Sequence, residues 1–175
     1  ASRRDDFVKD VRAMRARVID NIPAAQRGRQ LKLGSGGLRD VEFAVQLLQL
    51  VHGRADAEVR SPNTLRALQA LTERGYVGRD DGAALAESYE FLRTFEHRIQ
   101  MYRMQRTHLV PEDSEDLTRI GRSMGFNRDS AHALTQAWQE HRRVVSSLHE
   151  KIFFRPLLEA VAAIPTDDLT LSTEA

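Results

Sequence analysis

The chain has 175 residues, of which 41% are hydrophobic and 29% charged, a balance that excludes collagen-like, mucin-like and wholly disordered classes. It contains no cysteine, which excludes disulfides, thiolate catalysis and cysteine-type zinc sites and favours a reducing cytoplasm. The net charge is +1, yet residues 1–39 carry ten Lys or Arg against four Asp.

That uneven charge has two interpretations. Of the 26 basic residues 23 are Arg, which forms bidentate contacts with phosphate and carboxylate. An anionic partner near the N-terminal part is one reading, and compositional bias with solvated helix faces is the other. We find no helix-turn-helix or zinc-finger pattern, so no nucleic-acid partner is expected, and no apolar run approaches 18 residues, so no membrane span is expected either.

Apolar residues recur at helical spacing along most of the chain. The periodicity predicts main helices over residues 5–22, 38–52, 61–75, 79–104, 114–124 and 129–154. Ser61 with Pro62 is predicted to start the third helix, and Gly53 is placed to end the second, which is apolar on nearly every side and should be central. No useful period-two pattern is present. We expect an all-α bundle of five to seven helices, a single domain over residues 1–164, with residues 165–175 as a linker or disordered tail.

Known catalytic patterns are missing from the sequence. There is no G-x-S-x-G for a serine hydrolase and no Gly-rich loop ending in Lys-Ser or Lys-Thr for a P-loop. Only Asp129-x-x-His132 comes near the spacing of a helical di-iron site, so no metal site is expected.

The segment 31–43, LKLGSGGLRDVEF, is the most unusual stretch. Its glycines lead into a helix start that carries Arg39, Asp40 and Glu42. Backbone N–H groups there suit a phosphate, the carboxylates suit a cation such as Mg²⁺, and a tightly packed helix start held by local salt bridges is a third reading. Asp40 and Glu42 stand two positions apart on a helix, so they point about 200° apart and are not expected to hold one metal ion together.

A second candidate cluster lies after the longest predicted helix. Arg103, Arg106 and His108 stand close together in the sequence and form a weaker anion-facing candidate. Cations that stabilise the negative end of a helix dipole are the alternative explanation.

These segments together resemble a known family. Residues 32–43 (KLGSGGLRDVEF) and the following VQLLQL, then residues 89–100 (YEFLRTFEHRIQ) and 105–111 (QRTHLVP), resemble bifunctional glutamine synthetase adenylyltransferase/deadenylylase in order and spacing. The likeness covers about residues 7–155. A related Gly-Gly-Leu-Arg-Asp segment also occurs in PII uridylyltransferases.

The resemblance implies a helical domain that follows a nucleotidyltransferase domain, in the half that removes AMP, the N-terminal one. The motif carboxylates of that catalytic domain are missing here, so the chain is not expected to catalyse anything alone or to bind a cofactor. The parent would be a multifunctional nucleotidyltransferase of nitrogen regulation, using ATP or ADP with Mg²⁺. Its partners would be its own catalytic domain, glutamine synthetase as protein substrate and a PII signalling protein. The residues expected to support the active site or domain interface are Lys32, Gly36, Gly37, Arg39, Asp40 and Glu42.

Two alternatives remain open at this point. One is a stand-alone helical interaction module that binds a PII-type regulator. The other is the equivalent region of a PII uridylyltransferase.

Overall fold

The computed structural model describes residue 13 and residues 17–154. It is an all-α fold, as predicted, and the described residues contain no strand, only an isolated antiparallel bridge between Gln30 and Leu109. Most of the predicted helix 5–22, the end of the chain after residue 154 and the predicted tail lie outside the described residues. No described helix is long and apolar enough to cross a membrane. The elements, in chain order, are α2 (Ala24–Arg27), α3 (Leu38–His52), η1 (Ala57–Val59), α4 (Thr64–Glu73), α5 (Arg79–Arg103), α6 (Ser114–Ser123), α7 (Ser130–His149) and the π-helical turn η2 (Glu150–Phe154).

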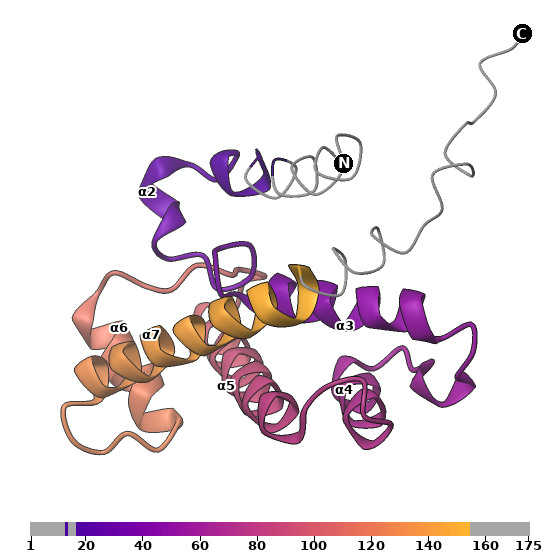
Figure 1. The fold of residues 1–175 in the computed structure, drawn as a ribbon. Helices are drawn as coiled ribbons and strands as arrows, with labels where there is room; N and C mark the ends of the chain where they lie inside the picture. Colours follow the sequence, from indigo (N-terminus) through magenta and orange to yellow (C-terminus); the bar gives the residue numbers. More distant parts are fainter. Residues whose placement is uncertain (1–12, 14–16, 155–175) are drawn as a thin grey trace, which may run out of the picture.

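The two longest helices, α5 and α7, form the centre of the fold (Figure 1). α7 contacts α3, α5 and α6, and α5 contacts α3 and α4 as well. The periodic apolar residues of the sequence meet between them, because positions three and four apart share one helix face. Phe95 of α5 is fully buried and meets the ring of Trp138 of α7 edge-on at 6.0 Å between centroids.

α4 begins later than predicted. Ser61 does not cap it; Asn63 does, by accepting a hydrogen bond from the Arg66 N–H at 3.0 Å. The Ser61 hydroxyl instead accepts from the Asn63 N–H, which makes a local turn around Pro62. The sequence prediction was wrong here because Ser61 and Asn63 are both good caps and only the backbone decides between them.

α4 ends at a glycine, as the sequence indicates. Gly75 has φ +80°, and the N–H groups of Gly75 and Tyr76 donate to the carbonyls of Thr72 and Leu71. This is the Schellman arrangement, in which a left-handed residue satisfies the last carbonyls of a helix. Gly53 after α3 is different, since its φ is −65° and its conformation is right-handed.

α3 is not buried on every side, contrary to the prediction. Leu38, Val41, Val45 and Leu48 face the core. Leu50 is 80% exposed, and Phe43 and Val51 are 40% and 43% exposed. The other helices cover one side of α3, so the residues that widen its apolar stripe remain at the surface.

Candidate functional site

The glycine-rich segment 30–37 forms a closed loop against the start of α3. The N–H groups of Leu38 and Arg39 donate to the carbonyls of Leu31 and Lys32, each at 3.1 Å, and the Asp40 N–H donates to Gly37. The Asp40 carboxylate accepts from the Gly36 N–H at 2.8 Å. These first-turn donors are already bonded within the chain, so they are not free to bind a phosphate in the way a bare helix N-terminus does.

The loop lies directly on the backbone of α7, and this contact requires glycine. Gly36 has φ +71°, and a Cβ there would stand 2.1 Å from the Arg142 carbonyl oxygen. At Gly37 a Cβ would stand 2.7 Å from the carbonyls of Leu31 and Lys32. The glycines therefore allow a close approach of backbones.

Arg142 of α7 fixes the loop from the other side. Its guanidinium donates to the Ser35 carbonyl at 3.1 Å and lies 5.2 Å from the centre of the Trp138 ring. Burial lowers the pKa of Arg142. The hydroxyls of Ser35 and Ser146 lie 3.2 Å apart. Sequence reasoning did not single out Arg142, because nothing local distinguishes it from the other 22 arginines.

The segment after α5 pairs with the residues just before the glycine loop. The Leu31 N–H donates to the His108 carbonyl, and the Val110 N–H donates to the Arg29 carbonyl, both at 2.9 Å. Two segments that carry the family resemblance are therefore neighbours in space.

A buried carboxylate holds this second segment in place. Glu96 of α5 is 1% exposed, and its two oxygens lie 2.5 Å from His108 Nδ1 and from the Arg93 guanidinium. A buried carboxylate needs such partners, because an unpaired charge inside a protein is costly. Glu96 belongs to the resembling stretch 89–100, but its role here was not predicted, since helix position alone does not reveal which acids are buried.

The remaining predicted residues of α3 and the loop lie at different depths. Asp40 is buried, whereas Arg39 is exposed and lies 4.8 Å above the ring of Phe43. Glu42 is half-buried and accepts a long hydrogen bond, 3.5 Å, from the Tyr89 hydroxyl, whose pKa burial raises. Lys32 is half-buried and has no ion pair with a described residue.

The hydrogen bonds of the two carboxylates lead to different places, since Asp40 accepts from the Gly36 N–H and Glu42 accepts from the Tyr89 hydroxyl. Within the described part of the chain, no group of three or more His, Asp or Glu side chains is placed to hold a metal ion.

The three weaker candidates do not share one open patch. Arg103 pairs with Asp116 at 3.0 Å, and Tyr102 also donates to that carboxylate. His108 turns toward Glu96. Arg106 is exposed and makes no ion pair with the residues that the structure describes.

Comparisons with known proteins bear on the whole region. The family model described as GlnD PII-uridylyltransferase matches residues 12–153. The chain is 61% identical over its full length to a bifunctional glutamine synthetase adenylyltransferase/adenylyl-removing enzyme of Streptomyces avermitilis, of which it covers 18%. Enzymes with the same name are 51% identical in Corynebacterium efficiens, over the full chain, and 53% identical in Mycobacterium leprae, over 92% of the chain; the match covers 17% of each. These matches confirm the resemblance seen in the sequence motifs, and the chain spans less than a fifth of the relatives' length.

Proposed function

The chain belongs to the GlnD PII-uridylyltransferase family, and from this premise we propose that it is a non-catalytic helical domain of a longer nucleotidyltransferase. In this proposal the domain packs against the catalytic domain and supports its active site. The parent adenylylates and deadenylylates glutamine synthetase in the regulation of nitrogen metabolism. The supporting observation is that the glycine loop and the α3 start bond internally, while Lys32 and Arg39 remain available at the edge of the same loop.

The parent's other properties belong to the same proposal. It uses ATP or ADP with Mg²⁺ in the catalytic domain, acts on glutamine synthetase and works in the cytoplasm, where a PII protein is a further partner. The segment Thr107–Pro111 and the glycine loop resemble the N-terminal half of the family, which supports placing the domain in the deadenylylating half. The names of the relatives favour this parent over a PII uridylyltransferase, because the Streptomyces, Corynebacterium and Mycobacterium relatives described above are all adenylyltransferases.

The geometry of the loop supports this proposed role. A closed loop seated on α7 is stiff, so a side chain at its edge, such as Arg39, is held in a fixed direction relative to whatever packs there. Arg39 is exposed and stacked on Phe43, and this contact limits the conformational freedom of its side chain before a partner binds. A guanidinium held in this way suits a carboxylate or phosphate in the neighbouring catalytic domain.

The test uses the parent enzyme with Arg39→Ala and, separately, Lys32→Ala. We expect removal of AMP from glutamine synthetase to slow roughly tenfold for Arg39→Ala, the effect of losing about 1.4 kcal/mol of positioning, with unchanged helicity and melting temperature. Arg128→Ala is the matched control, because Arg128 is exposed in the turn between α6 and α7, far from the loop. Unchanged rates in both test variants would refute the supporting role, and a loss confined to AMP addition would move the domain to the other half.

A further inference from the structure

The outward side of α3 carries a continuous stripe of exposed residues. We call Arg39, Phe43, Gln46, Leu50 and Arg54 the outer ridge of α3. The first four recur at intervals of three and four, which places them on one face, and Arg54 follows just beyond the helix end. Between its two terminal arginines the ridge carries two apolar side chains, Phe43 at 40% and Leu50 at 80% exposure, with the polar Gln46 between them.

The ridge borders a groove with a fixed floor. Gln46, Leu50 and the segment 60–62 line a hollow of about 550 Å³. Gln49 holds this floor in place, because its amide donates to the carbonyls of Val59 and Ser61, both at 2.8 Å. No described residue covers Leu50, so the hollow has a defined floor and this side chain at its edge is exposed.

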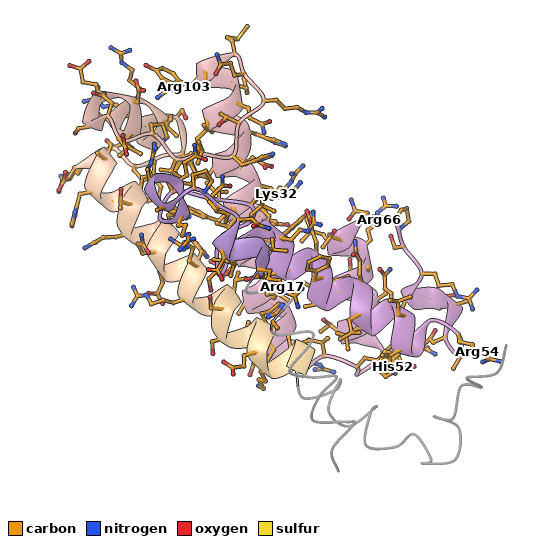
Figure 2. All side chains as sticks on the ribbon, turned by 90° about the horizontal axis from the view of Figure 1, so that it is seen from above. Arg17, Lys32, His52, Arg54, Arg66 and Arg103 are labelled. Carbon is orange, nitrogen blue, oxygen red and sulfur yellow. The ribbon has the colours of Figure 1, made fainter. Side chains whose placement is uncertain are left out.

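Cations predominate around the ridge, although Glu58 is exposed shortly after Arg54. Figure 2 shows Lys32 before α3, Arg54 after it and Arg66 on the neighbouring helix α4. None of these three residues, nor Arg39, forms an ion pair with a described carboxylate. The carboxylates of α3 itself are the buried Asp40 and the half-buried Glu42. A protein surface that covers the ridge would therefore match it best with acidic residues around an apolar centre.

We propose that the outer ridge of α3 is the surface on which another part of the same longer polypeptide docks, through an acidic patch with an apolar centre. This inference rests on the proposed function, because it assumes that the chain is one domain of a larger enzyme. The relatives are more than five times as long as this chain, so most of such a polypeptide lies outside it. The ridge, rather than the internally bonded glycine loop, is the exposed apolar surface next to the predicted site.

A second copy of the chain fits the ridge less well. Both ends of the ridge are cationic, so a parallel or antiparallel pairing of two α3 helices sets arginine against arginine. Like charges facing each other across an interface cost free energy. A separate acidic surface avoids this repulsion.

The experiment places a photo-crosslinking amino acid at position 50 of the parent polypeptide and maps the products by mass spectrometry. We expect crosslinks from position 50 to acidic peptides outside this chain but within the same polypeptide, with a yield that falls severalfold between 50 and 500 mM salt because the contact is partly ionic. The matched control is position 104, since Met104 is also apolar and 88% exposed but lies at the end of α5.

Four results would overturn the proposal: no crosslink from position 50, crosslinks between two copies of this chain, crosslinks only within it, or equal crosslinking from positions 50 and 104. A second variant guards against a disturbed fold: Leu50→Asp should lower crosslinking from a probe at position 46 at least fivefold while circular dichroism stays unchanged. The readout does not depend on enzyme activity. If position 50 gives no crosslink but Arg39→Ala slows the enzyme, only the docking proposal for the ridge is refuted. If Arg39→Ala leaves the rate unchanged, the proposed supporting function is refuted, and the crosslinks alone decide whether the ridge is a docking surface.

Discussion

The carboxylate of Asp40 lies 2.8 Å from the backbone nitrogen of Gly36, so the first turn of α3 closes the loop that precedes it. The two residues are four positions apart in the sequence, and the bond is buried. This contact makes Asp40 a part of the loop's architecture, which agrees with the packed helix start that was one of the readings of the sequence, beside a phosphate site and a cation site.

Because Asp40 is buried, replacing it should lower the stability of the fold. We expect Asp40→Ala to lower the free energy of unfolding by about 1–3 kcal/mol, because the buried Gly36 N–H loses its acceptor. Asp40→Asn should lose less, since the amide oxygen can still accept. Urea unfolding followed by the fluorescence of Trp138, the single tryptophan, measures both. Equal stability of wild type and Asp40→Ala would mean that the hydrogen bond contributes nothing.

Three glycines in different parts of the chain can be ranked by one series of alanine substitutions. Gly36→Ala combines φ +71° with a Cβ 2.1 Å from the Arg142 carbonyl and should prevent the loop from seating on α7. Gly75→Ala has φ +80° and open space, so it should cost only the backbone strain of about 1–2 kcal/mol. Gly28→Ala, with φ −69° and open space, should be neutral or slightly stabilising. Melting temperatures in any other order would contradict the steric argument.

The pairing of Glu96 with His108 predicts a local effect on the loop after α5. We expect His108→Ala to cost about 1–3 kcal/mol, because Glu96 stays buried with Arg93 as its remaining ion-pair partner. Hydrogen exchange at the Leu31 N–H, which donates to the His108 carbonyl, should speed up with it. The double variant Glu96→Gln/His108→Ala should lose less free energy of unfolding than the two single variants lose in sum, since the two residues interact directly. Strict additivity would show that they are independent.

His141 predicts how stability changes with pH. Burial lowers its pKa below the ordinary 6.5, an effect that Glu87 and Glu140 partly offset. The ring accepts or donates toward Ser88 at 3.0 Å and stacks on Phe91. The unfolded chain therefore binds a proton at a higher pH than the folded one does, so this contribution to stability is complete above about pH 6.5 and is lost as pH falls through the folded pKa.

The check is the melting temperature between pH 7.5 and 5. His141→Gln should flatten its decrease on acidification, whereas His132→Gln, at an exposed position at the start of the same helix, should not. A decrease of equal slope in the His141 variant would remove this histidine as the cause.

Several features of the fold were predictable because they depend on local rules. The range of α3 was visible in the spacing of Leu38, Val41, Val45 and Leu48, and the end of α4 in Gly75. The start of α4 was not, since Ser61 and Asn63 obey the same capping chemistry.

The site was harder to predict for a different reason. The motif directed attention to residues 31–43, whose functional role stays a prediction, and the resemblance to the adenylyltransferases is confirmed by the relatives. What the glycines contact, by contrast, depends on Arg142 and Ser146, more than a hundred residues later. The exposure of Leu50 depends likewise on which helices happen to cover α3.

The long sequence separation between Ser35 and its contacts on α7 has a consequence during synthesis. Ser146 follows Ser35 by 111 residues, so at about 5–20 residues per second the loop leaves the ribosome on the order of 5–20 s before α7 exists. In that interval neither the backbone contact at Gly36 nor the guanidinium of Arg142 is available to it. The nascent loop therefore lacks its contacts with α7 until that helix is synthesised. A ribosome pause before residue 142 should leave the loop accessible to proteases and chaperones.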